Sequence, residues 1–457
     1  MRTHTDRVPV ALLAGGFALA GAVAPALSDL PKPPDHPVLR LSKPEQNTLE
    51  IQIQLTAHLA NVQTSDGRYP TAYEVHEWNI STMVVVLPTI TTTASAIAVE
   101  DSVSGELFVD GRSLDNTPTI IGPYQSQAMY ARYEAGPVQA TGFRLVQKQQ
   151  LVCYETTYDE TLANTLPWPD VWPAEADSTF QPQQLVSEVR SDLANEGPVN
   201  DLVRKWTNDE DPRKIPPAYL AKFLTKQVWD HVRIVRPTIT NQPSDDGMVL
   251  VNSGNQIGRT DMAQGRGAVR SPDVGYYVQH ADETARAGTG SENDLPILLT
   301  AAMRAAGLPA RLVIGYREES EDSQDLSTSN RHRTWVEFAL FDPAANEGEG
   351  QLIWVPVDIT ELKESSSRSR PLERPWKYFG TNDELDTLVP VSHHFHPPTT
   401  VRSYSVPALY GWTTDPAPPD VASQGFTLNI SGTAIRGDAG QQEQQTRPRS
   451  RSRRRRP

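Results

Sequence analysis

Cysteine is nearly absent from this sequence. Among 457 residues there is one, Cys153, so an intramolecular disulfide is excluded. It lies in the segment "RLVQKQQLVCYETTY", which alternates like a strand, and we expect the thiol to be buried and unreactive. The segment is far upstream of the motifs described below, which excludes Cys153 as their nucleophile.

Positive charge is scarce outside the C-terminus. The chain carries 42 Lys and Arg against 56 Asp and Glu, and its formal charge is −14. Seven arginines lie in the last eleven residues, "RPRSRSRRRRP". The rest of the chain is therefore strongly acidic, which is unsuited to nucleic acid, and no specific nucleic-acid partner is expected. Contact between Arg447–Arg456 and an anionic surface is the alternative that we keep for this basic end.

The first 28 residues have the pattern of a secretion signal. A short basic start precedes an apolar run rich in Ala and Gly, and Ala24 and Ala26 have the A-x-A spacing of a cleavage site. A single membrane anchor is the alternative, because the run is about long enough to span a bilayer. We therefore expect a secreted or periplasmic protein, which this apolar segment could also anchor.

The rest of the chain divides into four segments. Residues 29–46 are rich in Pro and are predicted to be a linker. Residues 47–165 contain several alternating runs, such as "LEIQIQLTAHL", which predict an antiparallel β-sandwich. Residues 185–410 mix helical and strand patterns, which predicts an α+β domain; "QQLVSEVRSDLANEG" and "PPAYLAKFLTKQVWDHVRIV" are its first expected helices. Residues 411–457 are predicted to be a disordered, low-complexity tail, although "GFTLNISGTAI" could add a strand.

One stretch of the α+β domain predicts a helix, a tight turn and a strand. It is "GSENDLPILLTAAMRAAGLPARLVIGY", from Gly290 to Tyr316. Its apolar residues recur at i, i+3 and i+4, Ser291 starts a capping-box-like S-x-x-D, and Gly307 is placed to end the helix. Two later stretches, "HRTWVEFALFD" and "QLIWVPVDIT", alternate like strands.

These motifs, in this order, resemble the transglutaminase-like superfamily, a branch of the papain-like thiol enzymes. The family pattern has Gly-x-Cys-x-Asp at the helix start, Arg-Ala-x-Gly-Ile-Pro-Ala-Arg at its end, then His-x-Trp-Val-Glu and Trp-Val-Pro-Val-Asp. The resemblance is strong over residues 281–316 and 331–360. It implies a papain-like α+β domain and acyl transfer on amides by a Cys–His–Asp triad, with no cofactor or metal.

Carried over to this sequence, the triad positions hold Glu292, Arg333 and Asp358. Two of the three catalytic residue types are therefore replaced. Because Glu and Arg repeat the charge signs of a thiolate and an imidazolium, we expect these side chains to form a structural ion-pair network. The domain would then be inactive and would serve as a binding or scaffolding module, with a peptide or a cell-wall polymer in the old cleft.

A catalytic alternative uses neighbouring residues. Ser291, His332 and Asp358 together spell a Ser–His–Asp triad, which would make the protein an amide hydrolase or an acyl transferase. Geometry opposes it, because one residue turns a helix by about 100° and reverses the side-chain direction on a strand. Glycoside hydrolysis by Glu292 and Asp358 is a third possibility.

Overall fold

The computed structural model separates residues 1–30 from a unit formed by residues 31–457. It describes residues 31, 36–56, 78–180, 184–187, 190–191, 197–235, 248–253, 256–261, 275–276, 278–317, 332–366, 368–395, 397, 409–416 and 423–434. The expected secretion signal and the Arg-rich end lie outside these ranges. Within them, no helix has the length and apolar character needed to cross a membrane.

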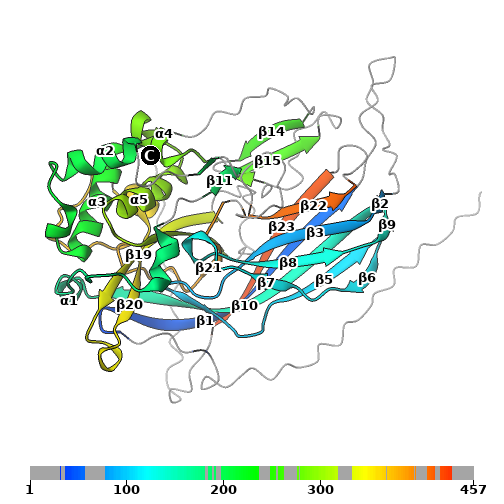
Figure 1. Cartoon of the computed structure of the whole chain (residues 1–457), viewed down its shortest axis with the longest axis horizontal. Coiled ribbons are helices and arrows are strands. Elements are labelled where there is room, and N and C mark those ends of the chain that lie inside the picture. The colour runs from blue at the N-terminus through cyan, green and yellow to red at the C-terminus, as the bar shows by residue number, and fades with distance from the viewer. Residues whose placement is uncertain are drawn as a thin grey trace, which may run out of the picture. The chain divides into compact units, whose positions relative to one another are not determined.

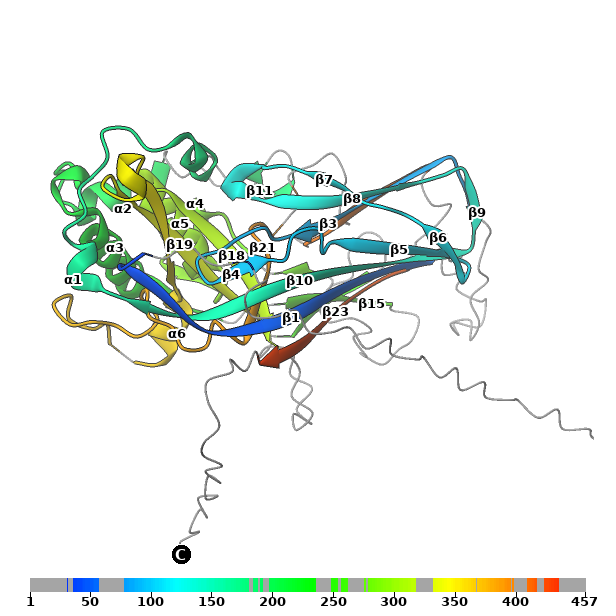
Figure 2. The same ribbon diagram turned by 90° about the horizontal axis from the view of Figure 1, so that it is seen from below.

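The N-terminal part is a β-sandwich of two antiparallel sheets (Figures 1 and 2). The sheets face one another through buried polar and aromatic contacts; the Tyr133 hydroxyl lies 3.0 Å from the Gln147 side-chain oxygen. One sheet has the order β23-β1-β10-β5-β6, with β4 also paired to β10. Its strands are β1 (Leu39–Thr56), β4 (Ala96–Ala98), β5 (Ser104–Val109), β6 (Arg112–Asp115), β10 (Gly142–Tyr158) and β23 (Ser423–Ala434).

The second sheet has the order β22-β3-β8-β7, and β2 pairs with β9 beside it. Its strands are β3 (Thr82–Thr89), β7 (Thr119–Ile121), β8 (Met129–Ala135) and β22 (Gly411–Asp415), and the extra pair is β2 (Trp78–Ile80) and β9 (Val138–Ala140).

Alternation along β1 produces the core of the sandwich, as predicted. Leu49, Ile51, Ile53 and Leu55 are each at most 1% exposed, because every second residue of a strand points to the same face. Cys153 in β10 is also fully buried, as expected.

The predicted boundaries of the sandwich are wrong at both ends. Strand β1 begins at Leu39, inside the expected linker, and the expected tail contains β22 (Gly411–Asp415) and β23 (Ser423–Ala434), of which β23 includes the stretch "GFTLNISGTAI" that could add a strand. Strand β23 pairs with β1 from Glu45 to Thr56. Without it, this edge of β1 would expose unpaired backbone groups, so a distant and mostly polar segment completes the sheet.

The α+β part combines helices with a four-stranded antiparallel sheet of order β20-β19-β18-β21. Helix α5 contacts α2, α3, β18 and β19 and is the centre of this part (Figure 1). The helices are α1 (Glu160–Ala163), α2 (Gly197–Trp206), α3 (Pro217–His231), α4 (Ala281–Ala287), α5 (Asp294–Ala305) and α6 (Ile359–Glu364). The sheet consists of β18 (Ala310–Arg317), β19 (His332–Asp342), β20 (Gln351–Val357) and β21 (Leu388–Ser392).

Short strands complete this part. The helix expected in "QQLVSEVRSDLANEG" is wrong, because its described residues form a hairpin whose cross-strand bonds outweigh the local helical pattern. The short strands are β11 (Gln184–Ser187), β12 (Arg190–Ser191), β13 (Arg233–Ile234), β14 (Met248–Ser253), β15 (Gln256–Asp261), β16 (Gly275–Tyr276) and β17 (Thr289–Gly290).

The turn after α5 follows the prediction closely. Gly307 has a φ of +85°, and its N–H donates to the Arg304 carbonyl at 3.0 Å. The N–H of Leu308 donates to the Met303 carbonyl at 2.9 Å. This pair of bonds is a Schellman motif, which needs a left-handed residue at the position of Gly307 and turns the chain sharply into β18.

Buried polar contacts join the sandwich to helix α5 and to the β18–β21 sheet. The Arg304 guanidinium donates to the Ser126 hydroxyl at 2.7 Å, and the Glu337 carboxylate accepts from the Ala94 N–H at 2.8 Å. Arg311 forms a two-pronged pair with Glu337, at 2.8 and 3.0 Å. All three charged side chains are at most 2% exposed, so they are structural.

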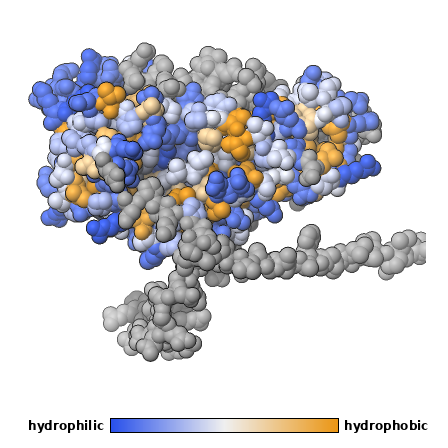
Figure 3. Space-filling view, turned by 60° about the horizontal axis from the view of Figure 1, so that its bottom comes forward, coloured by the Kyte–Doolittle hydropathy of each residue, from blue (hydrophilic) through white to orange (hydrophobic). Residues whose placement is uncertain are grey.

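The face shown in Figure 3 is mostly hydrophilic, with hydrophobic residues in separate patches.

Candidate functional site

The start of α5 carries the nucleophile position of the family motif. Asn293 is the N-cap of this helix, so Glu292 lies immediately before it. The Asp294 carboxylate accepts from the Ser291 N–H at 2.6 Å and from the Gln279 N–H at 2.7 Å. Burial raises the pKa of Asp294, and these bonds partly offset that rise. The aspartate of the predicted S-x-x-D therefore fixes the backbone next to Glu292.

Arg333, which the motif comparison predicts at the histidine position, is held by helix α6. Its guanidinium forms ion pairs with Glu361 and, at 3.8 Å, with Glu364. Burial lowers the pKa of Arg333, but the neighbouring carboxylates Asp358, Glu361 and Glu364 reverse the effect and raise it. The guanidinium therefore stays charged in this site.

Asp358, the predicted third triad position, is the N-cap of α6. Its carboxylate accepts from the Glu361 N–H at 3.0 Å. Its side chain is buried, which raises its pKa to about 7, although the charge of Arg333 acts in the opposite direction. Several carboxylates thus compete for one guanidinium.

Helix α6 adds partners to Arg333 that the sequence did not indicate. The ion pairs of Arg333 go to Glu361 and Glu364 of α6, and the charge of Asp358 also acts on its guanidinium. Glu292 is half-buried, and its backbone carbonyl accepts from the Thr360 hydroxyl at 3.3 Å. The sequence indicated a strand through residue 360, whereas the chain turns into a helix after Asp358. This turn brings Glu361 to Arg333.

His332 of the alternative Ser–His–Asp triad lies on the face of β19 opposite to that of Arg333, because neighbouring strand residues alternate in direction. The His332 ring lies 3.2 Å from the Thr334 hydroxyl and packs against Tyr276 and Tyr316, with ring centres 5.0 and 5.5 Å away. Burial, aided by Arg333, lowers the pKa of His332 to about 3.

Sequence reasoning missed the groups that do meet the start of α5 from β19. The Thr334 hydroxyl lies 3.2 Å from the side-chain oxygen of Asn293, and it also contacts His332. Thr334 lies in the quoted stretch "HRTWVEFALFD", but only the alternation of β19 could have indicated that it shares the face of His332.

Metal ligation is not indicated by the described side chains. Within the ranges given above, no three His, Cys, Asp or Glu residues are grouped as metal ligands. His393 and His394 lie instead against backbone carbonyls of Leu312 and Gln125, at 2.8 and 2.7 Å.

Comparison with known proteins identifies the family to which the α+β part of the chain is similar. Residues 261–359 match the model of the transglutaminase-like superfamily. The chain contains a transglutaminase-like domain. The resemblance read from the sequence motifs and the mixed α+β fold are thereby confirmed. The matched residues include all three triad positions of this domain.

Two solved structures are similar to the chain at low identity. One is a proposed cysteine protease from Cytophaga hutchinsonii, with 13% identity, a TM-score of 0.43, and coverage of 88% of this chain and 94% of that one. The other is a proposed protease from Parabacteroides distasonis, with 10% identity, a TM-score of 0.20, and coverage of 71% and 63%. No curated protein matches the chain.

Proposed function

We propose that the transglutaminase-like domain is not catalytic and acts as a binding or scaffolding module. The observation that carries this proposal is Arg333, which stands where the family has its histidine and is paired with Glu361 and Glu364. General acid–base catalysis needs a group that exchanges a proton near the working pH, and a guanidinium does not do so. A carboxylate at position 292 is also a poor nucleophile toward amides.

The proposed setting is outside the cytoplasm. It rests on the signal-like pattern of residues 1–28, whether this segment is cleaved or retained as an anchor. The proposed partner in the old cleft, at the start of α5, is a peptide or a cell-wall polymer. The basic run Arg447–Arg456 would add contact with an anionic surface.

The second candidate function is amide hydrolysis or acyl transfer by Ser291, His332 and Asp358. The buried imidazole of His332, which reaches the start of α5 through Thr334, favours it. Two features oppose it: a base with a pKa of about 3 abstracts protons weakly, and Asp358 lies on the side of Arg333.

The test is an assay of hydrolysis and amine incorporation on a broad peptide library. The purified protein lacking residues 1–28 is compared with Ser291→Ala, Glu292→Ala and the double variant Glu292→Cys/Arg333→His. We expect no turnover by the native sequence or by the two alanine variants. Acquired thiol reactivity in the double variant would support descent of the site from a thiol enzyme.

Two results would contradict the proposal. Turnover by the native sequence that Ser291→Ala abolishes would establish the hydrolase alternative. Turnover that only Glu292→Ala abolishes would indicate carboxylate chemistry, and glycoside substrates would then be assayed.

A further inference from the structure

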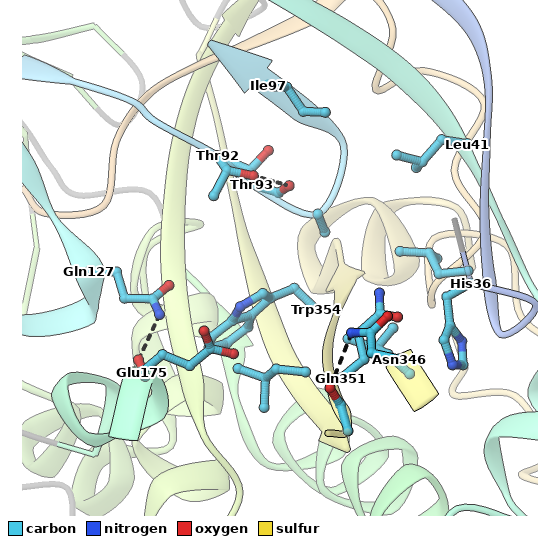
Figure 4. A pocket seen from close by; sticks show the side chains of 15 residues that line it. His36, Leu41, Thr92, Thr93, Ile97, Gln127, Glu175, Asn346, Gln351 and Trp354 are labelled. Atoms are coloured by element: carbon cyan, nitrogen blue, oxygen red, sulfur yellow. Dashed lines mark hydrogen bonds between the residues drawn. The ribbon is translucent and has the colours of Figure 1, made fainter. Parts of the chain in front are cut away.

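A pocket lies between the sandwich and strand β20, away from the triad positions. Its volume is about 530 Å³, which is within the range of about 300–1,000 Å³ for small-molecule sites. Figure 4 shows Leu41 and Ile97 from the sandwich on one side and Trp354 of β20 on the other. Neither the ion pairs of Arg333 nor the start of α5 contributes to its lining.

The outer edge of β20 is open beside this pocket. The Pro356 carbonyl accepts from the Gly380 N–H at 2.7 Å, and the Asp358 N–H donates to the Tyr378 carbonyl at 2.9 Å. Both bonds point away from β19, so even-numbered residues of β20 direct their backbone groups outward. Alternation extends this direction to Leu352 and Trp354.

The segment Tyr378–Gly380 covers only the C-terminal end of that edge. In the described part of the chain, β20 pairs with β19 along its length and with residue 379 at Val357 alone. The outward N–H and C=O groups of Leu352 and Trp354 are therefore available for a further strand.

The lining of the pocket shows that it meets this edge. All five residues from Gly350 to Trp354 line it. Successive side chains of a strand point to opposite faces of the sheet. Five consecutive residues can therefore border one space only where the backbone edge of the strand faces that space. Leu39 and Leu41, by contrast, are alternate residues of β1 and present side chains from the opposite wall.

The charged residues around the pocket limit the kind of ligand that it can bind. Among the described residues that line the pocket none is Lys or Arg, and the exposed Glu175 lies at the rim. The Arg311 guanidinium lies behind Trp354, 4.1 Å from its ring centre, and is neutralised by Glu337. An acidic ligand would therefore meet a carboxylate and no free cation, whereas a neutral or basic one would not be repelled.

We propose that this pocket binds an extended peptide, about five residues long and neutral or basic, as an added strand on β20. The backbone groups of Leu352 and Trp354 pair with the peptide. Its alternate side chains enter the apolar space between Leu41, Ile97 and Trp354. This inference goes beyond the proposed function, because the site lies outside the old cleft and does not depend on inactivity of the triad positions.

The experiment measures fluorescence polarisation with a library of labelled, terminally blocked pentapeptides of alternating apolar and polar residues. Neutral, Lys-containing and Glu-containing sets are compared on the protein lacking residues 1–28. The test variant is Leu352→Pro, which removes one outward N–H but no bond to β19, as Pro356 already does in the same strand. Leu352→Val keeps the N–H and is the matched control, and Gln54→Ala is a remote surface control.

We expect peptides of the neutral and Lys-containing sets to bind, with affinity about tenfold lower for Leu352→Pro and unchanged for both controls; tenfold corresponds to about 1.4 kcal/mol, or one good hydrogen bond. On the native sequence, N-methylation of the best peptide should weaken binding at alternate residues only. The absence of any binding peptide, equal binding by Leu352→Pro, or insensitivity to N-methylation would overturn the proposal. Binding that only Glu292→Ala abolishes would also overturn it and would place the peptide in the old cleft.

Discussion

The buried pair of Arg311 and Glu337 offers the sharpest test of how the two parts of the protein are held together. Their side chains are 1% and 0% exposed, and two nitrogens of Arg311 meet one carboxylate oxygen. The other oxygen of Glu337 accepts from the Ala94 N–H of the sandwich. Removal of either partner would leave a buried charge uncompensated.

The expected size follows from that burial. Breaking a buried pair by removing one partner costs about 3–5 kcal/mol, whereas replacing both partners by apolar groups of similar volume is often nearly neutral. We therefore expect Arg311→Met and Glu337→Met each to lower the free energy of unfolding by about 3–5 kcal/mol. The double variant should lose less unfolding free energy than either single variant. It still loses the hydrogen bond that Glu337 accepts from the Ala94 N–H, which costs about 1 kcal/mol.

Urea denaturation of the four proteins gives the double-mutant cycle. The matched control is Lys43→Ala, which breaks an ion pair with Glu155; the lysine side chain is 70% exposed, so solvent screens the pair and the change should have little effect on the free energy of unfolding. If the losses of the two single variants simply added in the double variant, the pair would carry no coupling energy and the reasoning would be wrong.

Two further predictions concern titration and reactivity. The pKa of Asp358 is raised by burial to about 7, against about 3.9 when unfolded, so this carboxyl stabilises the fold fully below about pH 4 and loses that contribution as the pH rises through 7. The difference in unfolding free energy between the native sequence and Asp358→Asn should therefore shift by up to about 4 kcal/mol between pH 4 and pH 8 in urea titrations; parallel curves would contradict this. Burial raises the pKa of the Cys153 thiol to about 12, so a thiol reagent at pH 8 should label it only after unfolding, and rapid stoichiometric labelling of the folded protein would refute its burial.

Much of the fold follows from local patterns in the sequence. The alternation of Leu49, Ile51 and Ile53 predicted β1, and the spacing of apolar residues predicted α5. Gly307 predicted the end of α5, because a left-handed residue is needed there. In β1 burial alternates with the period of the strand, whereas α5 is buried on all sides and only its apolar residue types follow the helical spacing, so in both cases a short window of sequence indicates the element.

The candidate site was only partly predictable from the sequence. The motifs predicted Glu292, Arg333 and Asp358 at the triad positions, and with them the replacement of two catalytic residue types. They did not indicate that α6 begins directly after Asp358 and offers Glu361 to Arg333. The choice of an ion-pair partner depends on groups brought together from different elements, which no local pattern records.

The sequence by itself thus determined the resemblance to the family and elements such as β1, α5 and the turn at Gly307, and it predicted the triad positions, because these depend on residue type and short-range periodicity. Only the tertiary structure decided that residues 411–434 return to the sandwich, that Arg304 and Arg311 are buried between its two parts, and that β20 keeps an open edge beside a pocket. The physical reason is that strand pairing and buried polar contacts join groups from different elements, which for β1 and β23 lie hundreds of residues apart. Their outcome is set by which backbone and charged groups remain unsatisfied after the local elements have formed.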